Sequence, residues 1–486
     1  MDVTTVQHLP LTTDLSTLIR NAAEEAARRG RAVVASLVHS VKAQAALSMF
    51  RRAHSVVSQR FFYARPSEKF VLTGFGSASV ITSVGTARFR QAATVRRELL
   101  IGACLEGVRG LSGVGPLFFG GFGFDPLNND QDRSLWAGFP DGRLVMPRVL
   151  YTQRDDNAYV TFNLLVEADC DPEAEAAELV GLWQEVAFGS DDAELTPPPT
   201  TVEVRDELRP AADWKADVAQ AAATIRLHHN ELEKVVLARA VQAQADRPFD
   251  VTEALGRLIA EYPDTHIFAI EHADHIFLAA TPERLVRLHR GQLLTMSLAG
   301  SMRRGKTEAE DEALATSLLR STKDRHEHAI VVQEIAAGLR DLVDGLTIPA
   351  DPSILRLKNV QHLCTPITGY LIEDYSLLDV VERLHPTPAV GGRPREAALS
   401  LIRELEKMDR GWYAAPVGWI DGKGDGEFVV ALRSALLHQN EAILFAGCGI
   451  MGDSDSEHEY AESNLKLRPM LSAPHPINAN GNTDNA

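Results

Sequence analysis

A lysine at the start of a largely apolar segment is the first candidate for chemistry. Lys234 opens the run KVVLARA, and a charged side chain in that place usually reaches solvent at the end of a strand. If the lysine is buried instead, the loss of water favours its uncharged amine, which can accept a proton as a general base. The motif alone favours the solvent-exposed interpretation and leaves the catalytic one open.

A second set of candidates lies near the C-terminus, in the segment SEHEYAESNLKL. Glu459 and Glu462 are three residues apart, and Lys466 follows four residues later. In a helix the three side chains therefore share one face. Taken alone, the pattern is typical of a solvated helix face that is held by salt bridges.

A third candidate is Glu327, which stands between His326 and His328 at the head of an expected helix. Neighbouring positions of a helix point in different directions, so the two histidines cannot easily share one metal ion, and the spacing is not that of a zinc site. A single carboxylate could supply one oxygen to Mg²⁺, which binds through one or two carboxylates together with substrate and water.

The elements that position these residues follow from the spacing of apolar residues. An amphipathic helix is expected over Thr12–Arg29, where Gly30 ends it, and short strands dominate from Val33 to about Asp169. Strand pairs punctuated by helices favour antiparallel sheets flanked by helices over a regularly alternating parallel sheet. The remaining expected elements are helices over about Trp214–Leu232, Thr307–Ser321, Lys323–Asp344 and Glu457–Met470, and strands over Val235–Gln244, His266–Ile270, Ile276–Ala280, Leu285–Leu288 and Leu293–Leu298.

The glycine-rich and proline-rich segments indicate packing and a division of the chain. Residues 120–124 read GGFGF but lack the Lys-Ser/Thr ending of a phosphate-binding loop, so close packing of strands is expected there. A polar segment with three consecutive prolines, residues 189–213, is predicted to be a linker. It would separate an N-terminal region, residues 1–188, from a catalytic region, residues 214–472; residues 473–486 are predicted to be a disordered tail.

Composition restricts the partners of the chain. Its 486 residues are 45% hydrophobic and 24% charged, as in ordinary globular proteins, and carry a formal net charge of −17. Such a surface repels nucleic acids and anionic membranes, so an anionic substrate would need local positive charge from Lys, Arg or a metal ion. The four cysteines form no CxxC pair, and the N-terminus shows no signal peptide. We therefore predict a cytoplasmic protein without a membrane span.

Nine segments in order resemble the chorismate-utilising enzymes, the family of isochorismate, salicylate, anthranilate and aminodeoxychorismate synthases. The similarity covers about residues 214–470, and the N-terminal region is only loosely similar. The resemblance implies an α/β (α+β) fold in which large antiparallel sheets are sandwiched between helices. The segments are KVVLAR from Lys234, TPERLVRL from Thr281, LAGSMRRG from Leu298, KDRHEH from Lys323, LHPTPAVGG from Leu384, GWYAAPVGW from Gly411, ALRSA from Ala431, LFAGCGI from Leu444 and EYAESNLKL from Glu459.

The resemblance implies that chorismate is the substrate and Mg²⁺ the cofactor. Glu327 and Glu462 match the ligands of the metal, and Glu459 and Asp324 match positions that reach it through water. The ion would hold the ring carboxylate of chorismate. The substrate-binding positions that the resemblance implies are Arg433 and Tyr413 for the enolpyruvyl carboxylate, and Gly300, Ser301, His362, Ala389, Gly447, Gly449 and Lys466 around the rest of the molecule.

Two positions matched to the family bear on the reaction. Lys234 matches the general base that activates water for attack on ring carbon C2, and Glu283 matches the general acid that protonates the departing C4 hydroxyl.

Ala299 stands where aminodeoxychorismate synthases carry a nucleophilic lysine, which disfavours that activity. Ala389 stands where salicylate synthases tend to carry Thr, which favours a reaction that stops at isochorismate.

The resemblance therefore implies an isomerase, isochorismate synthase, with menaquinone biosynthesis as the favoured pathway. Salicylate synthase activity and isochorismate supply for a siderophore remain the alternatives. No glutaminase subunit is required, and a monomer is favoured, although the sequence does not determine the oligomeric state.

Overall fold

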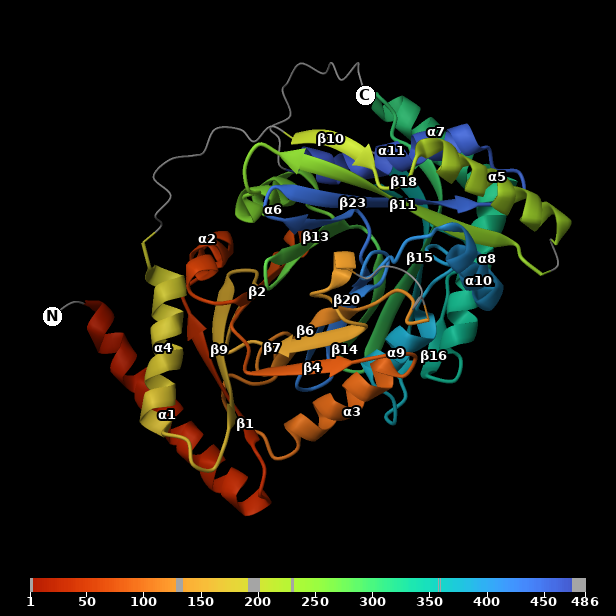
Figure 1. The fold of residues 1–486 in the computed structure, drawn as a ribbon. Coiled ribbons are helices and arrows are strands. Elements are labelled where there is room, and N and C mark those ends of the chain that lie inside the picture. The colour runs from red at the N-terminus through yellow and green to blue at the C-terminus, as the bar shows by residue number, and fades with distance from the viewer. Residues whose placement is uncertain are drawn as a thin grey trace.

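Two large, mainly antiparallel sheets form the body of the molecule (Figure 1). The computed structural model describes residues 3–127, 134–190, 202–228, 231–356, 358 and 360–473. Among these residues the first sheet has 13 strands, because β19 (Gly392–Arg393) also pairs with β11. Its strand order is β10 (Val202–Glu207), β11 (Lys234–Ala245), β23 (Glu441–Ile450), β22 (Ser434–His438), β13 (His275–Thr281), β12 (His266–His272), β2 (Gln59–Arg65), β3 (Phe70–Phe75), β8 (Val149–Arg154), β9 (Asn157–Val166), β1 (Val33–Val41) and β5 (Cys104–Gly107).

The second sheet has 10 strands in the same described ranges, with β17 (Ser353–Arg356) pairing with β18. It contains β15 and β16, the strands that come before and after the helical segment with Glu327 in the chain. Its strand order is β16 (Val343–Thr347), β18 (Val360–Leu371), β15 (Gln292–Arg303), β14 (Arg284–His289), β21 (Gly426–Val430), β20 (Pro416–Asp421), β6 (Leu117–Phe122), β7 (Gly142–Met146) and β4 (Ser79–Ser83).

The alternation of side chains along β2 explains why the two sheets pack together. Successive residues of a strand point to opposite faces. Phe61 and Tyr63 belong to the main hydrophobic core, whereas Phe62 belongs to a separate core on the other face. The ring of Phe61 stacks on Phe119 of β6, with ring centroids 4.3 Å apart. This contact joins the two sheets, so the main core lies between them.

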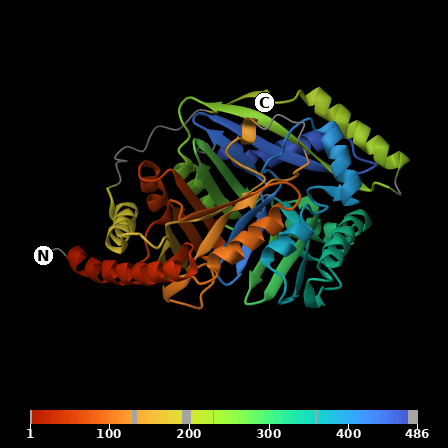
Figure 2. The same ribbon diagram turned by 60° about the horizontal axis from the view of Figure 1, so that its bottom comes forward.

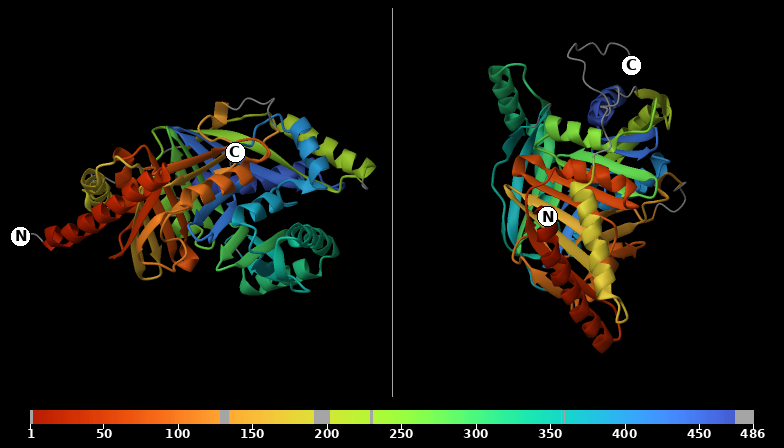
Figure 3. Two further views of the ribbon diagram at one scale, coloured as in Figure 1. Left: turned by 90° about the horizontal axis from the view of Figure 1, so that it is seen from below. Right: turned by 90° about the vertical axis from the view of Figure 1, so that its left-hand side faces the viewer.

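Helices cover the outer faces and the ends of the sheets. Figure 2 shows α1 (Val3–Arg29) at one end and α5 (Ala211–Leu227) at the opposite end. Figure 3 shows α7 (Glu308–Arg320) and α8 (Thr322–Leu339) on the side away from the N-terminus. The other helices are α4 (Pro172–Phe188), which packs with α1; α2 (Ala46–Arg52), α6 (Val251–Glu261) and α11 (Ser456–Ser472), which cover the first sheet; and α3 (Arg88–Leu100), α9 (Leu377–Leu384) and α10 (Arg395–Leu405). In the described part of the chain, no helix is both long and apolar enough to cross a membrane.

The expected fold class is confirmed, and two local differences have physical causes. Helix α8 ends at Leu339 instead of continuing to Asp344, because Val343 pairs with Leu371 in a sheet. Residues 202–207 of the expected linker form the edge strand β10, which pairs with β11. Residues 191–201 of the expected linker and residues 474–486 of the expected tail lie outside the described residues.

The glycine-rich segment 120–124 packs as expected. A Cβ atom on Gly120 would lie 1.9 Å from the carbonyl oxygen of Arg143, and one on Gly121 would lie 2.7 Å from Trp412. Both positions therefore require glycine for close approach of neighbouring chain segments, not for binding phosphate.

Candidate active site

A cavity of about 740 Å³ opens between the first sheet, the second sheet and helix α11. Five of the side chains that the sequence singles out line it, and they come from β15, β18, the residue before β22, and α11. Distant parts of the sequence thus meet at one hollow. These five residues are Ser301, His362, Arg433, Glu462 and Lys466.

Helix α11 brings Glu462 and Lys466 together on one face. The Lys466 Nζ lies 2.7 Å from Glu462 Oε1 and donates a hydrogen bond of 2.9 Å to the carbonyl oxygen of Gly447. Burial would raise the pKa of Glu462, but the charge and hydrogen bond of Lys466 lower it overall. The carboxylate is therefore an anion at neutral pH, although it lines a cavity.

Glu459 and Cys448 lie beside Glu462, and their side chains form a compact group of possible metal ligands. One ligand atom from each of the three residues lies within 4.8 Å of the others. Burial raises the pKa of Glu459, and the nearby charge of Glu462 raises it further. A cation placed here would relieve this repulsion, so the group fits a metal ion.

The thiol of Cys448 indicates which kind of metal ion fits. Burial raises the pKa of Cys448 to about 12, and its Sγ donates a hydrogen bond of 3.2 Å to the carbonyl oxygen of Glu459. A thiol that keeps its proton is a poor ligand, since metals bind the thiolate. The available donors are therefore carboxylate oxygens, which suit a hard cation such as Mg²⁺.

Lys234 is buried, in contrast to the usual place of a lysine at a strand end. Its side chain is only 9% exposed, and its Nζ donates a hydrogen bond of 2.6 Å to Glu327 Oε1 of helix α8. A Cβ atom on Gly449 would lie 2.7 Å from Lys234 Cε. Glycine at that position of β23 therefore leaves the space in which the lysine lies.

Glu283 is held by its backbone, and its carboxyl group forms no ion pair with any residue that the structure describes. Its N–H donates to Thr281 Oγ1 at 3.2 Å, and its carbonyl oxygen accepts a hydrogen bond from Val430 at 3.0 Å. Burial raises the pKa of Glu283 to about 7, against the opposing effects of Lys234 and Lys466. A large fraction of this carboxyl group therefore keeps its proton at neutral pH, within the electrostatic reach of both lysines.

Ser301 and His362 form a polar pair in the wall of the cavity. They are opposite each other in the β15–β18 ladder, and Ser301 Oγ lies 2.8 Å from His362 Nδ1. Burial lowers the pKa of His362 to about 4, and Arg433 and Lys466 add to this effect. The imidazole is therefore neutral at pH 7. Gly300, just before Ser301, has a φ of 77°, which favours glycine at this bulge.

Arg433 and Tyr413 lie near the same end of the first sheet. Arg433 lines the cavity and has a φ of 48°, in the left-handed region, just before β22 begins. Tyr413 is buried, and its ring stacks on Phe445 with centroids 5.1 Å apart. A Cβ atom on Gly447 would lie 3.1 Å from Tyr413 Oη. The glycine therefore keeps the hydroxyl from being crowded.

Three residues from the sequence prediction have other surroundings. Ser321 caps helix α8: its Oγ accepts a hydrogen bond of 3.2 Å from the backbone N–H of Asp324 and donates one to the Asp324 carboxylate. Ala389 lies in the loop before β19, and Gly391 of this loop accepts a hydrogen bond of 2.9 Å from Val236. Glu327 does not belong to the compact group of Cys448, Glu459 and Glu462. The roles assigned to these positions by resemblance stay predictions.

His328 has a structural role. Its Nδ1 lies 3.2 Å from the carbonyl oxygen of Ala299, and its Nε2 lies 2.7 Å from Thr365 Oγ1. These contacts link α8 to β15 and β18 at the helix turn that carries Glu327.

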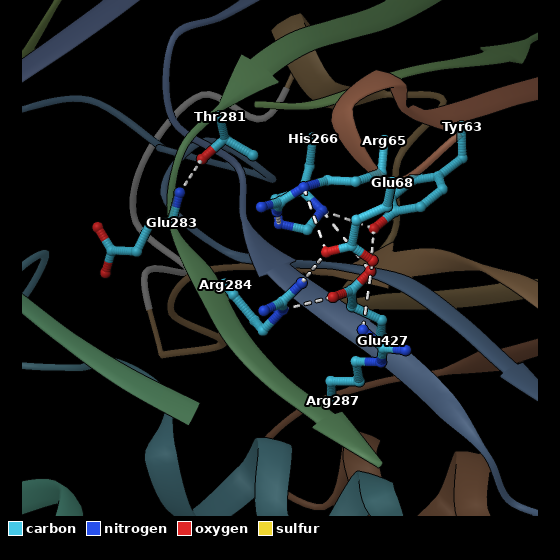
Figure 4. Close-up of polar contacts among 9 residues, drawn as sticks. All are labelled: Tyr63, Arg65, Glu68, His266, Thr281, Glu283, Arg284, Arg287 and Glu427. Atoms are coloured by element: carbon cyan, nitrogen blue, oxygen red, sulfur yellow. Dashed lines mark hydrogen bonds and ion pairs between the residues drawn. The ribbon is translucent and has the colours of Figure 1, made fainter. Parts of the chain in front are cut away.

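The sequence did not predict a buried polar cluster that is formed by Tyr63, His266, Arg284 and Glu427. Figure 4 shows Glu283 pointing away from Tyr63, His266, Arg284 and Glu427. The Tyr63 hydroxyl donates a hydrogen bond of 2.6 Å to Glu427 Oε2, and Arg284 donates to Glu427 Oε1. Because Tyr63 and Glu427 belong to different sheets, the cluster joins them. The nearest signal is Arg284 in the segment TPERLVRL, but only the fold brings its partners together.

Several basic side chains at the cavity were also missed. In the segment LAGSMRRG, only Gly300 and Ser301 were predicted to bind substrate, and Arg303 and Arg304 were not. Lys358 and Arg468 were not singled out at all. All four line the cavity, so the hollow has a positive rim in a protein whose net charge is −17.

The chain is similar to known proteins over most of its length. A family model described as "Chorismate binding enzyme" matches residues 21–474. This chain belongs to the chorismate-binding enzymes. The match begins well before the nine recognised segments, so the N-terminal region, too, is part of this family's common structure. Enzymes of the isochorismate synthase type need a divalent metal, which agrees with the carboxylate group on α11.

Relatives within this family of chorismate-binding enzymes cover nearly the whole chain. Isochorismate synthase MenF of Bacillus subtilis is 34% identical over 94% of this chain and 96% of its own length. The salicylate biosynthesis isochorismate synthase of Pseudomonas aeruginosa is 38% identical over 82% of each chain. The solved structure of MenF, the menaquinone-specific isochorismate synthase from Escherichia coli, matches with a TM-score of 0.75 and 25% identity, over 93% of this chain and 99% of that one.

Proposed function

We propose that this enzyme interconverts chorismate and isochorismate by adding water at ring carbon C2 with loss of the C4 hydroxyl. The observation that carries the proposal is a buried lysine within electrostatic reach of a partly buried carboxyl group that is about half protonated at neutral pH. Lys234 is one of two lysines that act electrostatically on Glu283, whose pKa burial raises to about 7. The similarity to two isochorismate synthases over most of their lengths supports this reaction among those of the family.

Lys234 acts as the base and Glu283 as the acid. The amine of Lys234 takes a proton from water as the water oxygen bonds to C2. The ring double bonds shift, and the C4–oxygen bond breaks. Glu283 gives its proton to the departing hydroxyl, which leaves as water. One water enters and one leaves, so the product is an isomer of the substrate. Proton transfers in the opposite direction restore both groups.

The substrate is a dianion, and the cavity supplies positive charge for it. Arg433 can donate two hydrogen bonds to one carboxylate, and the hydroxyl of Tyr413 lies near the same end of the sheet. Lys466 is fixed by Glu462 and Gly447 at 2.7 and 2.9 Å. Ser301 and the neutral His362 offer uncharged hydrogen-bonding groups to the ring. We propose that Gly300, Gly447 and Gly449 keep this space open and that Ala389 lies close to the ring.

The metal ion we propose is Mg²⁺. Bound to Glu327 and Glu462, and to Glu459 through water, it would neutralise the ring carboxylate of chorismate and compete with the lysine ammonium groups for these carboxylates. Lys234 can accept a proton from water only when its Nζ faces that water, and in this structure the Nζ donates a hydrogen bond of 2.6 Å to Glu327. Separation of Lys234 from Glu327 is therefore a requirement for the base.

The pathway we propose is menaquinone biosynthesis, without a glutaminase subunit. The support is the similarity to MenF of Bacillus subtilis and to the menaquinone-specific enzyme of Escherichia coli. Ala299 and Ala389, which differ from the residues typical of aminodeoxychorismate and salicylate synthases, favour isochorismate as the final product. The predictions of a monomer and of a cytoplasmic location stay predictions.

Product analysis tests the proposed reaction. The purified enzyme is incubated with chorismate, with and without Mg²⁺, and the products are separated by chromatography. We expect isochorismate to form only when the metal is present, and the Lys234→Ala variant to bind chorismate without converting it. Salicylate together with an equal amount of pyruvate would replace the proposal with salicylate synthase. Anthranilate formed from added ammonia would replace it with an ammonia-using activity.

A further inference from the structure

Two histidines and an aspartate form a compact group at the ends of two neighbouring hairpins. His275 and His438 are directly opposite each other in the β13–β22 ladder. Their rings stack with centroids 4.6 Å apart and planes inclined by 13°. Asp274 lies between them: its Oδ1 is 2.7 Å from His275 Nδ1, and its Oδ2 is 3.0 Å from His438 Nε2.

The backbone fixes this arrangement. Residues 273 and 274 are the two-residue turn between β12 and β13, and residues 439 and 440 are the turn between β22 and β23. The adjacent strands hold the two imidazoles in one cross-strand pair, where Cβ atoms are about 5 Å apart. Asp274 is on the exposed turn, with a side chain that is 61% exposed. It can therefore adjust its position, while the two histidines are held by the sheet.

We propose that Asp274, His275 and His438 bind a divalent transition-metal ion such as Zn²⁺. One ligand atom from each residue lies within 4.8 Å of the other two. Ligands of a tetrahedral zinc ion are about 2.0–2.2 Å from the metal, so two ligand atoms lie no more than about 4.4 Å apart. Small rotations of the three side chains therefore bring them into range. Imidazole nitrogen with carboxylate oxygen selects Zn²⁺, Ni²⁺ or Cu²⁺ over Mg²⁺, which binds oxygen.

The exposure of the group also suits a metal ligand set. The side chains of His275 and His438 are 24% and 38% exposed. A metal ion can therefore reach the ligands from solvent, and water can complete its coordination.

The metal site is separate from the cavity and has a different role. Strand β13 is seven residues long and runs from His275 to Thr281, beside Glu283. The two sites are therefore roughly 20 Å apart along the strand. A metal ion on His275 and His438 would fasten two hairpin ends of the first sheet, so it would stabilise the fold without taking part in the chemistry.

Metal counting tests the proposal on the full chain. The protein is stripped with a chelator, given excess Mg²⁺ to fill the carboxylate site, and dialysed against Zn²⁺, and the bound zinc is then measured by mass spectrometry. We expect the wild type to hold one more zinc ion per chain than His438→Gln. We also expect Zn²⁺ to raise the Tm of the wild type but not of the variant, because a ligand that binds only the folded state stabilises it.

Two further variants make the result decisive. His289→Gln is the matched control, since His289 pairs with one carboxylate, Asp425, at 3.1 Å and is 39% exposed; it should bind zinc as the wild type does. If His438→Gln does not fold, Asp274→Asn replaces it, because this exposed turn residue is not needed for packing. We expect Asp274→Asn to weaken zinc binding at least tenfold. Equal zinc binding in the wild type and in the variants at Asp274 and His438 would overturn the proposal.

The test is independent of the proposed reaction. Neither variant changes a residue at the cavity, so turnover of chorismate without added zinc should be unchanged. Loss of the zinc site would leave the isochorismate synthase proposal standing. Conversely, an enzyme with another reaction could still bind zinc at this place.

Discussion

The difference between Glu283 and Glu427 shows that the partners of a carboxyl group, and not burial alone, decide its charge. Glu283 precedes β14 and lies within electrostatic reach of Lys234 and Lys466, whereas Glu427 on β21 is buried between the sheets. Burial raises the pKa of Glu283 to about 7. Burial acts on Glu427 in the same direction, but His266, Arg284 and Tyr63 lower its pKa to about 2.

The partners of Glu427 differ in what they contribute. Burial lowers the pKa of His266 to about 3, so this imidazole is neutral at pH 7 and can only share hydrogen bonds. The anion is therefore held chiefly by the Arg284 guanidinium and the Tyr63 hydroxyl. Glu283 has no such donor among the described residues, and its two lysines bond instead to Glu327 and Glu462. One glutamate is thus suited to fasten the sheets and the other to transfer a proton.

The largest expected effect is on catalysis, in Glu283→Gln. Glutamine keeps the shape of the side chain but has no proton to give, so kcat should fall about 10²–10⁴-fold. The free energy of unfolding at about pH 4 should be nearly unchanged, because at that pH the carboxyl group is protonated in both the folded and the unfolded chain. Steady-state kinetics and urea unfolding measure the two quantities. Normal turnover in this variant would remove Glu283 from the mechanism.

Glu427→Gln should have the opposite profile. Removing one partner of a buried ion pair leaves Arg284 uncompensated between the sheets, at a cost of about 3–5 kcal/mol in the free energy of unfolding. Urea unfolding at pH 7 measures this loss. The control is Glu68→Gln, whose half-exposed carboxylate lies 3.2 Å from Arg284 and 3.3 Å from Arg287. It should cost less than about 1 kcal/mol; equal losses in the two variants would contradict the distinction.

The pH dependence of stability should distinguish the two carboxyl groups further. The pKa of Glu283 is about 7 in the folded state, against the ordinary value of 4.5 for a glutamate in an unfolded chain. Between these values the folded state binds more protons, so this group's contribution to stability falls as pH rises through the window. Glu283→Gln should therefore gain stability relative to the wild type between pH 5 and pH 8, by on the order of 2 kcal/mol. Unfolding curves at both pH values measure the gain; a constant difference would show that the pKa is not raised.

Tyr63→Phe should give the smallest effect. It removes the hydroxyl that lies 2.6 Å from Glu427 Oε2 and 2.8 Å from His266 Nδ1, while Arg284 still holds the anion. The expected loss is about 1–2 kcal/mol in the free energy of unfolding, with little change in kcat. A variant that loses activity while it keeps its stability would show that the cluster acts on Glu283 directly.

Local patterns predicted much of the fold because the sheets follow simple rules. The apolar segments Ile276–Ala280 and Leu293–Leu298 predicted strands that the structure contains as β13 and β15, and Arg290 and Gly291 form the turn between β14 and β15. Strand β10 was missed because its pairing with β11 comes from a distant segment. The end of α8 was missed for the same reason, since β18 recruits Val343 into the sheet.

The candidate site shows the same division. The resemblance selected Lys234, Glu283, Glu327, Arg433 and Glu462 by type and order. It did not show that Lys234 is buried against Glu327 or that Lys466 is fixed by Gly447, because these contacts join residues far apart in the chain. The basic rim formed by residues such as Lys358 and Arg468 lacks a local motif and could not be found without the fold.

What the sequence determined by itself is the family, the kinds of side chain available for chemistry, and most of the elements that carry them. These depend on residue type and spacing along the chain. The protonation of Glu283, the anionic state of Glu427 and the meeting of Asp274 with two histidines were decided only by tertiary structure. Charge and ligation depend on distance through space and on exclusion of water, and these distances exist only when the two sheets have packed together.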